Sequence, residues 1–230
     1  MRGGLKLAEN LRHGPSLAFA LCYGAAAIHL ARGEPDGALR ESERLIGVAT
    51  EQGLRAYLPI ARTIRGWALA KQGMREKGLS ELQSGLAAID AGPLKAFRAL
   101  FKAVLVEVHL DSGENNAGIA AATNAMQAVE TDHEVFWQAE ILRLRGELLL
   151  VSRDPSAAER SFEQALDASR RQSAKSLELR AAMSMARLWR DQGRVQQARE
   201  LLAPVYGWFT EGFDTRDLKE AKALLDEFAS

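Results

Sequence analysis

Histidine is the side chain best suited to acid–base or metal chemistry at neutral pH, and the chain has four of them. His13 and His133 fall in segments that connect helical stretches, with no cysteine or second histidine at metal-ligand spacing. His29 and His109 occupy one position of a sequence repeat. The same position in the other copies holds Leu69, Leu149 and Trp189. These apolar equivalents indicate that both histidines pack at the edge of the core rather than bind a metal or catalyse a reaction.

Cysteine and carboxylate chemistry is not indicated either. Cys22 is the only cysteine and lies in a strongly apolar stretch, so we expect a buried side chain and no disulfide. The pairs Glu41/Glu43 and Asp214/Asp217 are explained by a solvated helix face and a helix cap. The sequence lacks the motifs G-x-x-x-x-G-K-[ST], G-x-S-x-G, H-E-x-x-H and C-x-x-C. We therefore expect no catalytic residue, no cofactor and no bound metal, and predict that the chain is not an enzyme.

Arginine, glutamate and aromatic side chains recur at a spacing that places them on one concave surface of successive helices. This groove is predicted to be apolar in the N-terminal half of the chain and charged in the C-terminal half. Its candidate partner-binding residues are Tyr23, Trp67, Glu107, Glu140, Arg143, Glu147, Arg180, Arg187 and Arg190.

Two interpretations of the charged half stay open. In the first, Glu140 and Glu147 pair with Arg180 and Arg187 of the next copy and form a structural ladder. In the second, the arginines, with Arg190, await a carboxylate or phosphate, which a guanidinium binds through two parallel hydrogen bonds.

Two interpretations also stay open for Tyr23 and Trp67. Aromatic side chains dominate the binding energy of protein interfaces, so both could anchor an apolar side chain of a partner. Both could equally pack within the fold. The other tryptophans, Trp137, Trp189 and Trp208, are predicted to lie in the core.

The elements that must position these residues recur at one constant interval, marked by turn-forming stretches at Gly33, Gly73, Gly113, Arg153 and Gly193. A fixed period of about 40 residues is typical of stacked helical hairpins. The first helices are predicted at 16–32, 55–72, 94–112, 134–152 and 175–192, and the second helices at 36–52, 75–90, 115–131, 156–172 and 195–210. A last helix is predicted at 215–229, and residues 4–12 look like the second helix of a preceding hairpin.

Three columns of the repeat predict how the helices pack. Two columns hold mostly Ala or Gly, which lets helix axes approach closely. They are Ala26, Gly66, Val106, Gly146 and Ala186 in the first helices, and Ala38, Gly78, Gly118, Ala158 and Ala198 in the second. A third column is large and apolar and is predicted to fill the space between successive hairpins. It consists of Ile46, Leu86, Met126, Leu166 and Tyr206.

This pattern resembles the tetratricopeptide repeat. The fourth copy has Gly146 in its first helix and then Ala158, Phe162 and Ala165, the A-x-x-x-F-x-x-A pattern of that family. The period is longer than the family's usual period of about 34 residues, so the helices must be longer too. The resemblance implies an all-α, right-handed superhelix of about five hairpins with a C-terminal capping helix. We expect one solenoid over 1–230, with a remnant repeat at 1–15, five hairpins at 16–212 and the cap at 213–230.

A second resemblance concerns the strings at 136–150, 170–194 and 201–227, joined by HGPSLAFAL at 13–21 and RGWALAKQG at 65–73. They look like the C-terminal repeats of bacterial signalling proteins that carry a class III adenylate/guanylate cyclase or winged-helix domain and an ATPase. The resemblance implies a protein-interaction or sensor module of a signalling or transcription-regulatory system, with a protein or peptide partner, such as a cyclase- or ATPase-containing protein. The alternative is a sensor that binds a small-molecule effector.

Charge and hydropathy limit the kinds of partner that the chain is expected to bind. The 30 basic and 30 acidic residues cancel, which argues against a nucleic-acid partner. The uncharged run 16–31 is shorter than the ~20 residues of a typical membrane span, so we expect no membrane partner. The N-terminus lacks the apolar core of a signal peptide, and we expect a cytoplasmic protein.

Overall fold

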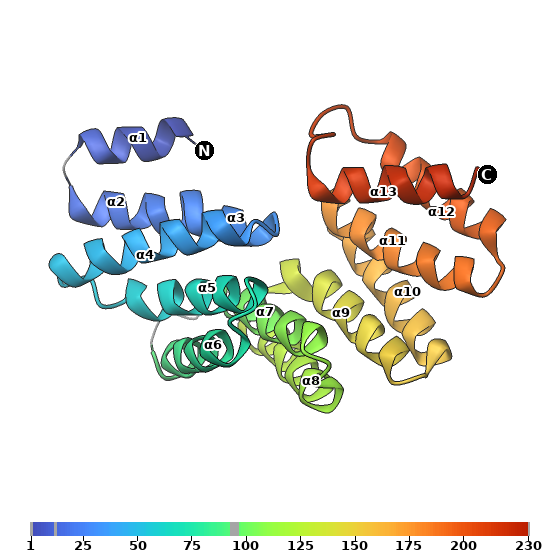
Figure 1. The fold of residues 1–230 in the computed structure, drawn as a ribbon, viewed down its shortest axis with the longest axis horizontal. Coiled ribbons are helices and arrows are strands. Elements are labelled where there is room, and N and C mark those ends of the chain that lie inside the picture. Colours follow the sequence, from blue (N-terminus) through green and yellow to red (C-terminus); the bar gives the residue numbers. More distant parts are fainter. Residues whose placement is uncertain (1, 12, 93–96, 230) are drawn as a thin grey trace. The chain divides into compact units, whose positions relative to one another are not determined.

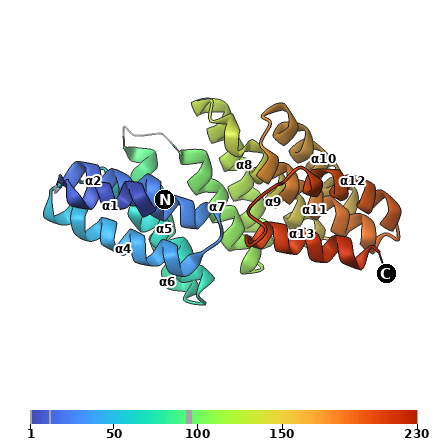
Figure 2. The same cartoon turned by 90° about the horizontal axis from the view of Figure 1, so that it is seen from above.

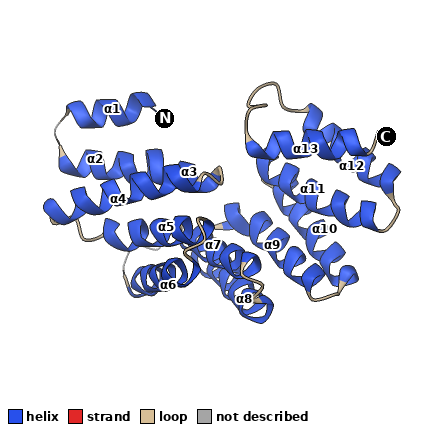
Figure 3. Cartoon of the chain, in the orientation of Figure 1, coloured by secondary structure: helices blue, strands red, loops and turns tan. Residues whose placement is uncertain are grey.

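The computed structural model describes residues 2–11, 13–92 and 97–229, and every regular element in these ranges is helical (Figures 1 and 3). The all-α fold class is therefore confirmed. Residues 94–96 of the predicted helix 94–112 lie outside the described residues, as does residue 12 of the predicted helix 4–12. The elements are α1 (Arg2–Asn10), α2 (Gly14–Leu21), the π-helical turn η1 (Cys22–Ala26), α3 (Ala27–Ala31), α4 (Pro35–Glu51), α5 (Tyr57–Lys71), α6 (Arg75–Ala91), α7 (Arg98–Asp111), α8 (Asn115–Asp132), the 3-10 turn η2 (Val135–Trp137), α9 (Gln138–Val151), α10 (Pro155–Arg171), α11 (Lys175–Asp191), α12 (Val195–Gly207) and α13 (Arg216–Glu227).

The chain divides into two compact units, Met1–Val108 and His109–Ser230, called the N-terminal and C-terminal units below. The boundary falls within α7. In the N-terminal unit α5 packs against α6 and α4, and in the C-terminal unit α9 packs against α10 and α11 (Figure 1). Consecutive helices thus form the predicted hairpins in both units. That the two units belong to one continuous solenoid stays a prediction from the sequence.

The five turn positions predicted by the period share one backbone structure. Gly33, Gly73, Gly113, Arg153 and Gly193 all have positive φ, between 62° and 90°. In the first turn Gly33 N–H donates to Leu30 O at 3.0 Å and Glu34 N–H donates to His29 O at 2.9 Å. The same pair of bonds recurs at the other four turns. This is the Schellman motif, which satisfies the last carbonyls of a helix.

The left-handed positions reveal a half-period that the sequence pattern does not show. Gly53, His133 and Ser173 also have positive φ, and each lies midway between two of the five turns. In these parts of the chain, one helix and the turn that follows it therefore span half of the repeat period. This holds for the first and for the second helix of a hairpin.

Both small-residue columns are buried, as predicted. A Cβ added at Gly66 would lie 2.5 Å from Leu82 N and 2.6 Å from Gly78 O, so only glycine lets these two backbones meet. A Cβ at Gly146 would overlap the ring of Phe162. In the large column Leu86 and Leu166 are buried, and the others are partly buried.

The fourth copy also forms the core that its pattern predicts. Ala158, Phe162 and Ala165 are fully buried. They belong to an apolar cluster of the C-terminal unit that runs from Ala139 to Phe228.

One N-terminal stretch, Gly14–Ala31, is long and apolar enough to cross a membrane by length and composition, with a mean hydropathy of 1.4. The prediction that this run is too short to span a membrane is therefore not supported by length. A core helix of a soluble protein has the same composition, and here α2, η1 and α3 all pack against α4.

The last helix, α13, packs on α11 and α12 of the C-terminal unit (Figures 1 and 2). It buries Leu218, Ala221 and Leu224, in agreement with a capping role. The preceding segment differs from expectation, because Trp208 is 58% exposed rather than part of the core. Trp208 directly follows the end of α12, packs edge-on against Phe209 at 5.2 Å between ring centroids, and has Lys175 Nζ 6.0 Å from its own ring centroid.

Candidate partner-binding surfaces

The candidate residues fall into two groups that belong to different units. Tyr23, Trp67 and Glu107 lie in the N-terminal unit. The charged group lies on α9 and α11 of the C-terminal unit and consists of Glu140, Arg143, Glu147, Arg180, Arg187 and Arg190.

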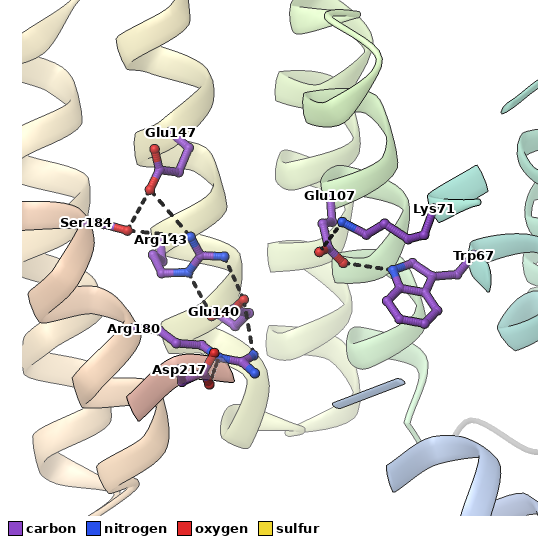
Figure 4. A network of polar contacts seen from close by, with 9 residues as sticks. All are labelled: Trp67, Lys71, Glu107, Glu140, Arg143, Glu147, Arg180, Ser184 and Asp217. Atoms are coloured by element: carbon purple, nitrogen blue, oxygen red, sulfur yellow. Dashed lines mark hydrogen bonds and ion pairs between the residues drawn. The ribbon is translucent and has the colours of Figure 1, made fainter. Parts of the chain in front are cut away.

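Trp67 is a core residue of the N-terminal unit, 1% exposed. Its indole Nε1–H donates to Glu107 Oε2 at 2.9 Å, and Lys71 Nζ lies 2.6 Å from Glu107 Oε1 (Figure 4). Trp67 and Glu107 are one period apart, so this bond joins equivalent positions of consecutive repeats. The geometry favours packing over partner anchoring for Trp67.

Tyr23 lies in an exposed aromatic row, which we define as Phe19, Tyr23 and Phe97. The Tyr23 ring is 5.0 Å from that of Phe19 and 5.2 Å from that of Phe97. Phe19 is 57% exposed and Phe97 is 41% exposed, whereas Tyr23 is half-buried between them. Sequence reasoning identified Tyr23 but missed its two neighbours.

The backbone at Tyr23 is unusual, because Cys22–Ala26 forms a π-helical turn inside the first helix of the repeat. Such turns are frequent at functional sites. Burial raises the pKa of the Cys22 thiol to about 12, which leaves it un-ionised at neutral pH. Burial, together with the nearby Cys22 and Tyr57, also raises the pKa of Tyr23 to about 12.

The centre of the charged group is Glu140, which is 9% exposed. Arg143 donates to both of its oxygens, at 2.8 and 3.0 Å, and Arg180 Nη1 lies 3.6 Å away (Figure 4). Burial alone would raise the pKa of Glu140, but Arg143 and Arg180 outweigh burial and lower that pKa to about 2. The Glu140–Arg180 pair agrees with the ladder interpretation.

The second expected rung is replaced by other contacts. Glu147 accepts a hydrogen bond from Ser184 Oγ at 2.6 Å and lies 3.4 Å from Arg143 Nη1. Arg187 donates instead to Glu220 Oε2 at 3.0 Å. Glu147 and Arg187 therefore do not form the predicted rung, because α13 provides a carboxylate beside Arg187.

All three arginines of α11 have a carboxylate partner on α13. Arg180 Nε donates to Asp217 Oδ2 at 2.7 Å, and Arg190 Nη1 donates to Glu227 Oε2 at 3.1 Å, alongside the Arg187–Glu220 bond. From the sequence, Asp217 is expected to cap a helix, and neither Glu220 nor Glu227 is a candidate. The sequence did contain a signal for these partners, because Asp217, Glu220 and Glu227 share one face of the predicted last helix.

The histidine column also makes structural contacts. His29 Nδ1 lies 2.6 Å from Glu34 Oε2, and His109 Nδ1 lies 2.6 Å from Glu114 Oε2. In the fifth copy Trp189 replaces histidine, and the guanidinium of Arg194 lies 4.6 Å from its ring centroid. In each of these copies, the side chain at the end of the first helix contacts a side chain just after the Schellman turn. These contacts agree with a structural role for His29 and His109.

Helical hairpins repeated at a fixed period, with small buried residues at the helix crossings, define this chain as an all-α helical-repeat protein. No protein-family model matches the sequence, and no curated protein sequence matches it. Among solved structures it is similar to the crystal structure of MamA, with 14% sequence identity and a TM-score of 0.48. That similarity covers 89% of this chain and 96% of the MamA chain. A similarity at this level carries no conclusion about function.

Proposed function

We propose that the chain is a non-catalytic protein-interaction module that binds a peptide or a partner domain through the aromatic row Phe19, Tyr23 and Phe97. The observation that carries this proposal is the exposure of two phenylalanines in contact with one tyrosine. Exposed aromatic clusters are energetically costly to leave in water and are typical of interface hot spots.

The polar candidates support the same assignment. Trp67 and Glu107 satisfy each other, and the arginines of α11 are paired with carboxylates. The aromatic row, in contrast, offers apolar surface to a partner. The resemblance of the sequence to the repeats of cyclase- and ATPase-containing proteins supports a cytoplasmic bacterial signalling or transcription-regulatory system as the setting, with such a protein as the partner.

The test is a titration of the full chain against each cyclase- or ATPase-containing protein that the neighbouring reading frames are found to encode. We expect Phe19→Ser and Phe97→Ser each to weaken binding at least about tenfold, the scale of a hot-spot residue. Val151→Ser, which changes an exposed apolar residue of the other unit, is the matched control. Binding that both phenylalanine variants retain in full would exclude the aromatic row.

The same preparations test for catalysis. We expect no ATP or GTP hydrolysis and no cyclic nucleotide formation above buffer level. Turnover that co-purifies with the chain and disappears in a point variant of it would contradict the non-catalytic assignment.

A further inference from the structure

The apolar contacts that hold α13 form one stripe that joins the apolar cluster of the C-terminal unit. The helix has 12 residues and buries Leu218, Ala221 and Leu224, with Phe228 just beyond its end. The neighbouring helix α11 buries 10 of its 17 residues. Isolated helices shorter than about 12–15 residues are marginal in water, so α13 depends on its docking contacts.

The polar contacts of α13 include three ion pairs in a row along α11. They join Asp217 to Arg180, Glu220 to Arg187 and Glu227 to Arg190. The last two pairs are partly exposed, and partly exposed pairs add little to stability because water and salt screen them. Helix α13 is therefore bound by charge complementarity and a short apolar stripe.

The surface beneath α13 also has contacts that do not involve α13. Arg180 remains beside Glu140, which Arg143 holds through two hydrogen bonds. Arg187 and Arg190 project from the extensively buried helix α11. The arginine row is thus pre-organised for a carboxylate-bearing helix, a condition that favours binding.

The connection to α13 is compatible with release. Residues 208–215 link α12 to α13 without a helix, and Trp208 and Phe213 in this link are exposed. Gly212 within the link has a positive φ of 79°. The link also has contacts of its own, because Phe209 packs against the apolar cluster and the Phe213 ring lies 6.0 Å from that of Tyr206.

We propose that the face of α11 and α12 covered by α13 is a receptor for an acidic amphipathic helix of a partner protein, and that α13 occupies it as an intramolecular competitor. The fitting helix carries carboxylates at the spacing of Asp217, Glu220 and Glu227. Its apolar stripe follows Leu218, Ala221, Leu224 and Phe228. Recognition of this type lays the apolar face of a helix in a groove, with charges that fix its register. The receptor is separate from the aromatic row, so either proposal can fail without the other.

The test measures binding of a fluorescent peptide, residues 213–229 of this chain, to the full-length protein by anisotropy. One protein is the parent, and the other carries Asp217→Asn, Glu220→Gln and Glu227→Gln, which weaken its own α13. The apparent affinity of the receptor for the peptide is lowered by the fraction of the protein in which α13 has left it, so we expect the variant to bind the peptide about tenfold more tightly than the parent. A peptide with the same three amide substitutions should bind the variant at least tenfold more weakly than the unchanged peptide.

Three controls make the result decisive. Glu163→Gln, Asp167→Asn and Glu200→Gln remove three exposed carboxylates from α10 and α12, and this protein should bind the peptide like the parent. Adding Arg187→Ala to the α13 variant should reduce its gain in affinity, because one of the three ion pairs with the peptide is lost. Hydrogen exchange should be faster in α13 of the variant and unchanged in α9 and α10.

Three outcomes would overturn the proposal. The first is absence of peptide binding to a variant whose α13 exchanges quickly, which would leave α13 as a structural cap only. The second is equal affinity for the parent and both variants, which would place the peptide elsewhere. The third is a parent dimer that exchanges α13 between copies, which would make a second copy the occupant.

Discussion

Gly146 of α9 has no room for a side chain, because a Cβ there would overlap the ring of Phe162. We expect Gly146→Leu to lower the free energy of unfolding by about 1–3 kcal/mol through overpacking. Urea denaturation measures the loss. Glu76→Lys, at an exposed position of α6, should change stability by no more than about 0.5 kcal/mol. A Gly146→Leu midpoint equal to that of the parent would mean that the helices do not cross at this residue.

Arg153 holds a left-handed conformation, φ 62°, at the turn position where four other copies have glycine. This conformation costs a non-glycine residue about 1 kcal/mol, so Arg153→Gly should raise stability by about 0.5–1 kcal/mol. The matched reverse change is Gly113→Ala, since a Cβ at Gly113 would meet nothing within 4 Å and only φ is tested. It should lower stability by about 1 kcal/mol. Thermal unfolding of both variants checks the pair, and shifts of the same sign would be inconsistent with this account.

At the scale of elements, Glu140 links α9 to α11 through Arg180, and it also pairs with Arg143 of its own helix. The pKa of Glu140 in the folded chain, about 2, is below its ordinary value of 4.5. Ionised Glu140 therefore stabilises the fold above about pH 4.5, and this contribution is lost as the pH falls from 4.5 towards 2. We expect Glu140→Gln to cost about 1.5–3 kcal/mol at pH 7, the scale of hydrogen bonds to charged groups.

Urea denaturation at several pH values tests this dependence. The difference between parent and Glu140→Gln should shrink steadily below pH 4.5. Glu163→Gln, at an exposed position of α10, is the control and should show no such trend. A difference that stays constant down to pH 3 would show that Glu140 is not ionised in the fold.

The helices and turns could be predicted because their signals are local. Gly33, Gly73, Gly113 and Gly193 supply left-handed turns, and Pro35 and Pro155 begin the helices that follow two of the five turns. The columns of small residues predicted where helices cross, and this signal is also local. A residue with little or no side chain allows two helices to approach closely at that position. The predicted helices agree with the structure to within a few residues in the described ranges.

The partners of the charged residues could not be predicted to the same degree. The repeat predicted that Glu140 would meet Arg180, because both occupy one column. The repeat alone did not predict that Ser184 would contact Glu147, or that α13 would place acids beside the arginines, because those contacts join different columns. For the acids of α13 the sequence signal was their shared helix face. The exposure of Trp208 was missed as well, since composition alone does not tell which aromatic of a loop faces the core.

At the scale of the whole molecule, the contacts of the chain divide it into two compact units, and the single stack that the period predicts stays a prediction. In repeat proteins the free energy of unfolding depends mainly on each repeat and its contacts with adjacent repeats. A substitution that destabilises one repeat therefore need not destabilise distant repeats. Gly66→Ala tests this. The added Cβ would lie 2.5 Å from Leu82 N, a backbone atom that cannot move aside, and should cost about 2–3 kcal/mol.

Hydrogen exchange with mass spectrometry locates that loss. We expect faster exchange in α5 and α6 of the Gly66→Ala variant and unchanged protection in α9 and α10. Equal acceleration in both units would show that they unfold as one cooperative body.

The distribution of tryptophan gives the two units different optical signals. The N-terminal unit contains only Trp67, sealed in its core, whereas the C-terminal unit contains Trp137, Trp189 and Trp208, all at least partly open to water. Short-wavelength emission that resists a dissolved quencher therefore belongs to Trp67. The quenchable, red-shifted emission belongs to the other three. Ordinary fluorescence can thus follow each half of the native chain separately, without any added label.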